Sequence, residues 1–259
     1  MSSFSRSYGY RFNWRGLLTP AIKTLVIANT AVFLVQTLVA LLVGPAGTGW
    51  LLRWFALIPS AVTHGLRVWQ PFTYLFLHGG LWHLLLNMLV LWMFGRDLEL
   101  TWGRRRFYIY YFVCGVGAGL INILVKSVPV LFGRPPSDVA TIGASGAIYG
   151  ILLAAAVLFP DRQVWLFPFP LTLPMRVYVL IFGAMAFFGS LGATGDNISH
   201  ISHLGGMLVG YIYLRRGSFL YGVRNRLSDW RRRRLRRKFD VYMRDHDDKP
   251  PSRPDRWVN

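Results

Sequence analysis

A serine set among small residues is the first group in this sequence that could do chemistry. Ser145 lies within Gly143-Ala144-Ser145-Gly146, at the start of an apolar run that continues to Phe159. Glycine leaves room for another helix to approach the hydroxyl, and it frees the backbone to direct N–H groups toward a ligand. A serine hydroxyl is a weak nucleophile unless a neighbouring base accepts its proton. If this serine reacts, the chain must therefore bring a base close to it.

His203 is the histidine best placed to be that base. Histidine has a reference pKa of about 6.5, so it is largely neutral and can accept a proton near pH 7. Gly206 and Gly210 follow it as a small-residue helix face, and Gly146 and Gly150 form a second such face. Two such faces allow close approach of two helices, although they could equally serve packing alone. We expect the two helices to bring the serine and the histidine together.

His83 and Asn87 are four residues apart, so they share one face of a helix. An acyl-transfer reaction develops negative charge on an oxygen and needs hydrogen-bond donors directed at it. The His83 imidazole, the Asn87 amide and the backbone N–H of Ser145 could be those donors. The alternative is an interhelical hydrogen bond that only holds the helices together.

The composition indicates a membrane protein. The chain of 259 residues is 53% hydrophobic, 15% charged and carries a net charge of +18, with a mean hydropathy of +0.37. A soluble nucleic-acid binder could be as basic, but it would not contain six long apolar stretches. The N-terminal residues lack the pattern of a cleaved signal peptide, so we expect the first apolar run to be a retained span.

Six apolar segments are long enough to be membrane helices, and no internal repeat is evident. The segment between the first two contains Gly, Pro and Trp and is predicted to be a loop at the membrane interface. The predicted spans are Ala21–Val43, Pro71–Gly95, Phe107–Lys126, Gly143–Phe159, Leu171–Leu191 and Ile198–Leu214. The sequence therefore predicts an all-α membrane protein with six transmembrane helices.

Basic residues predict the orientation of these spans. Lys and Arg are concentrated in the N-terminal tail, in the connector Arg96–Arg106 and in the tail from Arg215 onward. By the positive-inside rule both termini are cytoplasmic. The second, fourth and sixth spans then run from the outside inward. The polar side chains near their beginnings are consequently expected in one layer below the outer surface.

The domain organisation follows from the same pattern. We expect a basic cytoplasmic tail over residues 1–20, a six-span domain over 21–216 and a basic, disordered cytoplasmic tail over 217–259. The run Arg231–Lys238 is expected to bind anionic lipid headgroups, and we expect no nucleic-acid partner.

Other uses of these polar residues are less consistent with the sequence. Zinc bound by His78, His83 and His203 would lack a carboxylate, and the first two do not share a helix face, so we expect no metal. The single cysteine, Cys114, cannot form an intrachain disulfide. Transport is a rival, but no acidic residue falls within a predicted span. His200 competes with His203 as base; we expect it near the headgroups. His64 and His78 are assigned no chemical role.

Three motifs together resemble the rhomboid family of intramembrane serine proteases. Gly143-Ala144-Ser145-Gly146 resembles the GxSG motif of that family, and His203-Leu204-Gly205-Gly206 with Gly210 resembles its HxxGxxxG motif. His83 and Asn87 match its HxxxN motif. The match covers about Ala21 to Arg216, with the motifs in the family's order on the expected spans. A lone GxSG would be weak, because soluble esterases also carry it.

The resemblance implies roles for individual residues. It implies a catalytic dyad of Ser145 and His203 without an acidic third member, and an oxyanion hole that includes His83 and Asn87. It implies that Tyr149 stacks on the catalytic imidazole and thereby orients it, in the place of the aspartate of soluble triads. It implies a structural hydrogen-bonding role for Glu99. It requires no cofactor.

The chain also departs from the family pattern at two places. A Trp-Arg pair of the family stands here as Trp69-Gln70, and Ser202 precedes the histidine where alanine is common. The first change puts the anchoring of the loop before the second span in question.

The sequence thus predicts a six-span intramembrane serine endopeptidase of the rhomboid type, with both termini in the cytoplasm. Its expected substrates are transmembrane segments of other proteins, and its expected location is a bacterial inner membrane. The alternative is a non-catalytic rhomboid-like protein that binds or escorts membrane clients.

Overall fold

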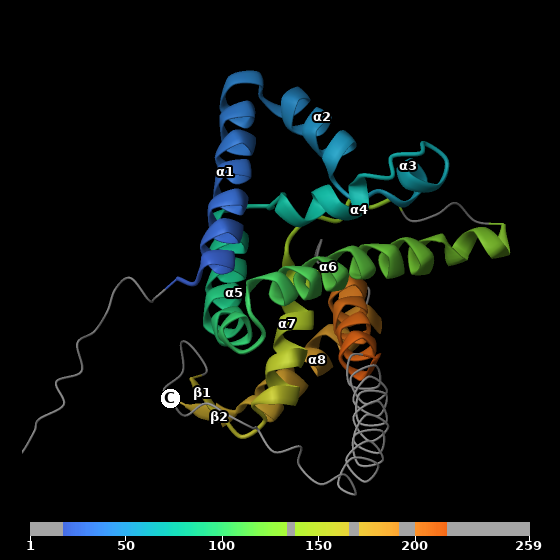
Figure 1. The fold of residues 1–259 in the computed structure, drawn as a ribbon. Helices are drawn as coiled ribbons and strands as arrows, with labels where there is room; N and C mark the ends of the chain where they lie inside the picture. The colour runs from blue at the N-terminus through green and yellow to red at the C-terminus, as the bar shows by residue number, and fades with distance from the viewer. Residues whose placement is uncertain (1–17, 134–137, 166–170, 192–199, 217–259) are drawn as a thin grey trace, which may run out of the picture. The chain divides into compact units, whose positions relative to one another are not determined.

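The computed structural model describes residues 18–133, 138–165, 171–191 and 200–216, which are mostly helical. All of them up to Tyr213 belong to one compact unit, Met1–Tyr213 (Figure 1). The elements are α1 (Pro20–Val43), α2 (Pro45–Phe55), α3 (Pro59–Thr63), α4 (Gln70–Thr73), η2 (Tyr74–Phe76), α5 (Leu81–Trp102), α6 (Arg104–Ser127), η3 (Val128–Phe132), α7 (Ser145–Leu158), β1 (Gln163–Trp165), β2 (Thr172–Pro174) and α8 (Met175–Leu191). Residues 200–216 form one more helical stretch. The predicted tail over 217–259, and nearly all of that over 1–20, lie outside the described residues.

Among the described helices, two are long and apolar enough to cross a membrane. They are α1 and the stretch Arg104–Phe132, with mean hydropathies of 2.2 and 1.8. The bent pair Gln70–Phe76 and Leu81–Trp102 passes the same test together, and α7 and α8 are shorter apolar helices. This part of the chain is a largely helical membrane protein with two or three candidate spans. The six-span arrangement goes further and stays a prediction.

Helix α1 has the surface expected of a helix in contact with lipid. Its 24 residues span about 36 Å at 1.5 Å per residue, enough for a hydrocarbon core of about 30 Å. Only 6% of its most apolar window is buried, and Leu34, Leu38, Leu41 and Leu42 are all more than half exposed. An apolar face of this length is stable in lipid and costly in water.

The predicted second span, Pro71–Gly95, is not one continuous helix. The segments before and after Gly79-Gly80 meet at an angle of 97°. The break is possible because a side chain of α1 satisfies its backbone: Gln36 Nε2 donates to the carbonyl of His78 (3.3 Å), and the His78 N–H donates to Gln36 Oε1 (3.1 Å). Without such partners, broken backbone is unfavourable at membrane depth.

Glu99 of α5 caps the N-terminus of α1, which has no side-chain cap of its own. Its carboxylate accepts hydrogen bonds from the backbone N–H groups of Ala21 (2.8 Å) and Ile22 (3.2 Å), and from the Thr19 hydroxyl. A buried carboxylate is favourable at this position because helix N-termini carry exposed N–H donors and a partial positive charge. This contact fixes where α1 begins relative to α5.

The predicted interface loop, Gly44 to Gln70, contains two helices, α2 and α3. The last carbonyl groups of α2 are bound by side chains around α4. Gln70 Nε2 donates to the Arg53 carbonyl (2.9 Å), Trp69 Nε1 to the Trp54 carbonyl (2.8 Å), and Thr73 Oγ1 to the Phe55 carbonyl (2.8 Å). The Gln70 Oε1 atom also accepts from the N–H of Ile58 (3.0 Å).

Gln70 therefore anchors this loop although it stands where the family has arginine. Its amide supplies both a donor and an acceptor, and its side chain is fully buried. The guanidinium of Arg67, three residues earlier, donates to the Arg53 carbonyl (2.5 Å) and lies 4.5 Å from the centre of the Trp54 ring. A positive charge is thus still present at the end of α2.

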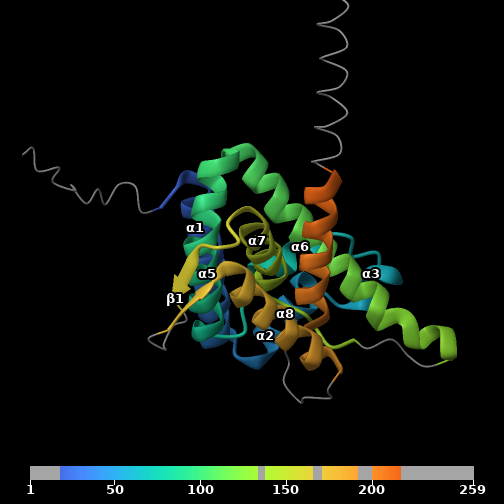
Figure 2. The same cartoon turned by 90° about the horizontal axis from the view of Figure 1, so that it is seen from below.

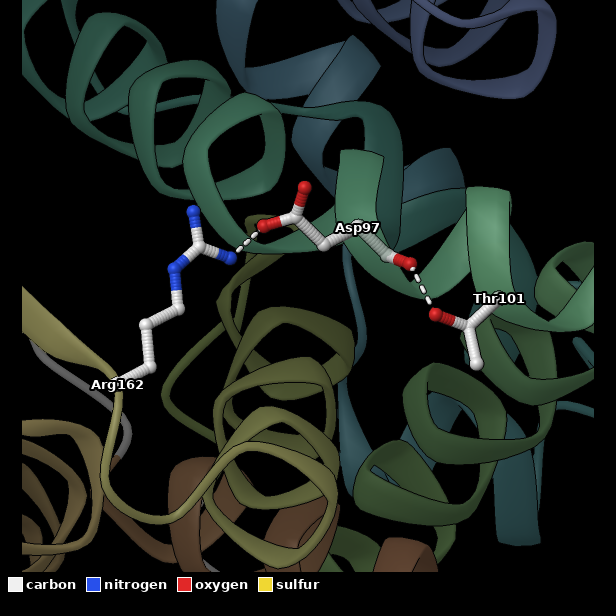
Figure 3. A network of polar contacts seen from close by, with 3 residues as sticks. All are labelled: Asp97, Thr101 and Arg162. Carbon is white, nitrogen blue, oxygen red and sulfur yellow. Dashed lines mark hydrogen bonds and ion pairs between the residues drawn. The ribbon is translucent and has the colours of Figure 1, made fainter.

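A short antiparallel hairpin, β1 and β2, connects α7 to α8. An ion pair ties its base to α5: the Arg162 guanidinium contacts the Asp97 carboxylate, while the Asp97 carbonyl accepts from the Thr101 hydroxyl (2.7 Å) (Figure 3). Arg176, at the start of α8, pairs with Asp161, which lies just before β1 (3.3 Å). The two exposed ion pairs thus link the turn before the hairpin to α5 and to the start of α8.

Helix α6 runs across α7 and the helix of residues 200–216 (orange in Figures 1 and 2). Buried tyrosines hold α6 to its neighbours. Tyr74 of η2 donates to the Gly115 carbonyl (2.7 Å), and Tyr110 of α6 donates to the Gly150 carbonyl (2.7 Å). Each phenol thus has a partner in the core, which an isolated buried hydroxyl would lack. Helix α6 is the element that touches both halves of the site described next.

Candidate active site

Ser145 is the first residue of α7, directly after a constrained turn. Gly143 has a φ of +118°, which side chains rarely allow. A Cβ at Gly143 would lie 2.8 Å from both Cε1 and Nε2 of His83. The Gly143 N–H donates to the Tyr74 carbonyl (2.9 Å). The turn therefore needs glycine for its backbone conformation and for the space that the His83 ring occupies.

The hydroxyl of Ser145 lies within hydrogen-bond distance of His203. The Ser145 Oγ and His203 Nε2 atoms are 2.8 Å apart, although 58 residues separate them in sequence. His203 is 9% exposed, and among the described residues its Nδ1 atom has no hydrogen-bond partner. A neutral imidazole with its proton on Nδ1 can accept the serine proton at Nε2.

Tyr149 lies one turn after Ser145 on α7 and stacks on the same imidazole. The two rings are nearly parallel, with an interplanar angle of 5° and centroids 4.2 Å apart. Such a contact restricts rotation of the imidazole about its side-chain bonds. The His203 ring is thus held by a ring on one face and by the serine hydroxyl at its edge.

Small residues bring α7 and the helix of residues 200–216 into backbone contact. A Cβ added to Gly206 would overlap the carbonyl oxygen of Gly146. One added to Gly150 would lie 3.2 Å from the Gly206 carbonyl oxygen, and one added to Gly210 would lie 3.4 Å from the Gly150 Cα. Larger side chains at these positions would push the helices apart, and Ser145 and His203 with them.

His83 lies close to the turn before Ser145 with a defined hydrogen-bonding pattern. The N–H of Gly79 donates to His83 Nδ1 (3.3 Å). A neutral imidazole that accepts at Nδ1 carries its proton on Nε2, and Nε2 and Cε1 form the edge of the ring nearest Gly143. His83 thus presents a donor beside the segment that leads to the serine.

Asn87 lies one turn further along α5 and is 6% exposed. Its Nδ2 atom donates to the His83 carbonyl (2.9 Å). An amide nitrogen has two N–H donors, so this bond leaves one for another acceptor. The described contacts of Asn87 are with its own helix.

The other three histidines in the described part of the chain occupy different environments. His64 is exposed after α3 and contacts Thr63. The buried ring of His78 lies against His83, with centroids 5.1 Å apart. The His200 ring packs against Gly189 of α8 and stands perpendicular to His203, with centroids 5.9 Å apart; its expected place near the lipid headgroups stays a prediction. Within the described ranges, no group of three or more His, Cys, Asp or Glu could hold a metal ion.

Two polar residues of α6 adjoin the site although the sequence interpretation did not single them out. Asn122 donates to the hydroxyl of Ser202, and Lys126 donates to the segment before Ser145. A signal was available, because polar residues within an apolar span are costly unless they have partners. The identity of those partners, however, depends on the packing of distant segments.

Comparison with known proteins agrees with the motifs. A family model described as the rhomboid domain matches residues 65–217, more than half of the chain. Rhomboid protein 1, mitochondrial, of Saccharomyces cerevisiae is 31% identical over 139 residues, which cover 53% of this chain and 38% of the yeast protein. RHOMBOID-like protein 1 of Arabidopsis thaliana is 30% identical over 168 residues, covering 64% and 40%. Rhomboid protease GluP of Bacillus subtilis is 29% identical over 144 residues, covering 55% and 25%.

These helices and this site define a helical membrane protein with a serine and a histidine in contact. The chain belongs to the rhomboid family. The resemblance drawn from its three motifs is thereby confirmed. The matched segments span between a quarter and two fifths of the length of these three relatives.

Proposed function

We propose that this chain is an intramembrane serine endopeptidase that cleaves transmembrane segments of other proteins with a Ser145–His203 dyad. The single observation that carries the proposal is the 2.8 Å contact between Ser145 Oγ and His203 Nε2. Family membership supports it, since relatives named as rhomboid proteases share about 30% identity with this chain. Tyr149 supports it as well, because stacking holds the imidazole in the orientation that the contact requires.

In the first half of the reaction, Ser145 Oγ attacks the carbonyl carbon of a substrate peptide bond while His203 Nε2 accepts the hydroxyl proton. The tetrahedral intermediate collapses when the C–N bond breaks. His203 returns the proton to the leaving nitrogen, so one peptide product departs as an amine. The other product remains as an ester on Ser145.

Three donors are proposed to stabilise the oxygen of that intermediate. They are the N–H of Ser145, which as the first helical residue has no intrahelical acceptor, the Nε2–H of His83 and the second amide N–H of Asn87. Such preorganised donors are worth about 3 kcal/mol each in acyl-transfer enzymes. Their effect is largest in a site that excludes most water.

In the second half, water attacks the ester carbonyl carbon while His203 accepts one of its protons. The ester C–O bond breaks, the proton passes to Ser145 Oγ, and the substrate leaves as a carboxylic acid. The sum is hydrolysis of one peptide bond, and neither a cofactor nor a metal enters the balance. A substrate helix must open before its carbonyl can be reached, so helix-destabilising residues favour cleavage.

The proposal includes the finer arrangement of the chain in the membrane. It places both termini and the tails over 1–20 and 217–259 in the cytoplasm, with six spans over 21–216 between them. It assigns the bacterial inner membrane as the compartment and anionic lipid headgroups as partners of the C-terminal Arg-rich run. Support comes from the distribution of Lys and Arg along the chain.

The test is cleavage of a reporter membrane helix by the purified full chain in liposomes. Ser145→Ala and His203→Ala are each expected to lower kcat by at least a thousandfold. The first removes the nucleophile, and the second removes the base that accepts its proton. His64→Ala is the matched histidine control, since its side chain is exposed and distant in sequence from the motifs. Ser190→Ala, in α8, is the matched serine control. Undiminished cleavage by either dyad variant would refute the assignment.

A client-binding role is the competing function, and it predicts a different reaction with a serine-directed fluorophosphonate. The proposed enzyme is expected to be labelled at Ser145, and labelling is expected to disappear in His203→Ala. A protein that only binds clients would remain unlabelled and would retain client binding in Ser145→Ala.

A further inference from the structure

Helix α6 carries two polar side chains for which the proposed reaction has no direct use. Asn122 is fully buried, and Lys126 is partly buried near the end of the helix. They are four residues apart, so they lie on one face of α6. Each contacts a segment that leads directly to one member of the Ser145–His203 pair.

Asn122 contacts the residue that precedes the histidine. Its Nδ2 atom donates to Ser202 Oγ (2.9 Å), and the Ser202 side chain is 1% exposed. The Ser202 carbonyl oxygen in turn lies 3.4 Å from the position that a Cβ of Gly146 would take. Three helices therefore meet around this one hydrogen bond, one residue away from both Ser145 and His203.

The backbones of α6 and the histidine-bearing helix also approach closely here. A Cβ added to Gly205 would lie 3.2 Å from Ile121 and 3.3 Å from the Cα of Ala118. Apolar contacts of this kind favour proximity but tolerate small sliding movements. A buried hydrogen bond does not tolerate them, because sliding would leave polar atoms unsatisfied at a cost of about 1–3 kcal/mol. The Asn122–Ser202 bond thus fixes the register of the two helices.

Lys126 contacts the segment that precedes the serine. Its Nζ atom donates to the Val139 carbonyl (2.8 Å) and to Thr141 Oγ1 (3.0 Å). Thr141 exchanges two backbone hydrogen bonds with Leu57 (2.9 and 3.0 Å). Thr141 is two residues before Gly143 and four before Ser145, so this bridge fixes the approach of the chain to the nucleophile.

The same segment is held at a second point. The Asp138 carboxylate accepts hydrogen bonds from the N–H (3.0 Å) and the hydroxyl (2.6 Å) of Ser60, at the start of α3. The segment over residues 138–143 is thereby fixed between α6 and the loop that contains α3. Of the contacts just described for this segment, only those of Lys126 come from α6.

We propose that Asn122 and Lys126 are positioning residues that set the separation of Ser145 and His203. The proposal rests on the proposed protease function. Asn122 acts on the base through Ser202, and Lys126 acts on the nucleophile through Thr141, so one face of α6 controls both. A shift of about 1 Å between two reacting groups can lower a rate about a hundredfold. Sliding one helix past its neighbour by a single residue would move it about 1.5 Å, so even a small change of register would matter.

A double-mutant cycle tests the Asn122 half of this proposal. Asn122→Ala and Ser202→Ala are each expected to lower kcat about fivefold at unchanged KM, since both side chains are buried and outside the proposed dyad and oxyanion hole, and a hydrogen bond contributes about 1 kcal/mol. The double variant is expected to be no slower than either single variant, because both remove the same bond. Leu124→Ala, exposed on α6 between the two polar residues, is the control and should keep wild-type kcat.

Lys126 is tested by charge and donor replacement. Lys126→Met keeps the length of the side chain but loses the donors, and we expect kcat to fall about fivefold; Lys126→Arg keeps donors and should restore most of the rate. All rates are expressed per active site, titrated with a fluorophosphonate, so that partial misfolding does not imitate a loss of kcat. Independent, multiplicative losses in the Asn122–Ser202 cycle, or a change confined to KM or to thermal stability, would overturn the proposal.

Two outcomes distinguish a failure of the protease role from a failure of the positioning roles. A wild-type chain that leaves the reporter intact and does not react with the fluorophosphonate would overturn both the protease and the positioning roles. A wild-type chain that cleaves and requires Ser145, but tolerates Asn122→Ala and Lys126→Met at full kcat, would overturn only the positioning roles.

Discussion

At the scale of single residues, the imidazole of His203 is held by contacts of very different kinds. Tyr149 covers one face of the ring, Ser145 meets its Nε2 edge, and His200 stands perpendicular to it. Within the described residues none of these partners is a carboxylate. The orientation of this imidazole therefore comes from stacking and packing rather than from an ion pair.

Tyr149 offers a direct test of that orientation. Tyr149→Ala is expected to lower kcat about five- to tenfold, because a stacked aromatic pair is worth about 1 kcal/mol and 1.36 kcal/mol corresponds to a factor of ten in rate. Tyr149→Phe keeps the ring and should retain nearly full kcat. The measurement is steady-state cleavage of the reporter helix. Equal losses in both variants would show that the hydroxyl, and not stacking, is what matters.

At the scale of elements, the meeting of α7 with the helix of residues 200–216 depends on the absence of side chains. Gly206→Ala would place a methyl group against the Gly146 carbonyl. We expect a loss of about 1–3 kcal/mol in the free energy of unfolding, as for other overpacked cores, together with loss of cleavage as Ser145 and His203 separate. Unfolding in mixed detergent micelles gives the stability, and the reporter gives the activity.

Gly183→Ala is the matched control for this substitution. Gly183 lies on α8, and a Cβ there would meet Met207 at ordinary contact distances of 3.5 and 3.6 Å. Alanine is also the better helix former. This variant should be as stable as the wild type or slightly more stable, and it should retain cleavage. If it proved as damaging as Gly206→Ala, close approach at Gly206 would not be the cause.

Element boundaries also mark what the sequence could and could not predict. The three motifs indicated the family, and the apolar runs at Ala21–Val43 and Phe107–Lys126 lie within the observed helices α1 and α6. The break at Gly79-Gly80 was missed because it depends on Gln36, more than forty residues away in sequence. Helix α2 was missed because its end is bound by Trp69, Gln70 and Thr73 of a later segment.

The site shows the same division between local and distant information. Spacing alone relates Ser145 to Tyr149 and His83 to Asn87, since each pair lies on one helix. The contacts of Asn122 with Ser202 and of Lys126 with Thr141 join residues 80 and 15 apart. A pattern within one segment carries no information about such partners. Gln70 illustrates this: its amide stands in for arginine by binding the backbone N–H of Ile58 and the carbonyl of Arg53, which belong to an earlier segment.

At the scale of the whole molecule, the proposed topology can be tested because the chain has a single native cysteine, Cys114, which is buried. His64→Cys places a thiol in the predicted outer loop, and Arg105→Cys places one in the predicted inner connector; both native residues are exposed. A membrane-impermeant maleimide is expected to label the first variant in intact cells and the second only after the membrane is opened. The parent chain should remain unlabelled. Labelling in the reverse order would invert the proposed orientation.

The contact between Gln36 and the backbone of His78 has a consequence for biosynthesis. The carbonyl and N–H of the break before α5 find their partner on α1, which leaves the ribosome first. The partner is therefore synthesised before the bent segment that needs it. In the opposite order, unpaired backbone groups would enter lipid at a cost of several kcal/mol each. Synthesis in this order makes the hydrogen-bond partner on α1 available before the break that precedes the His83 helix is formed.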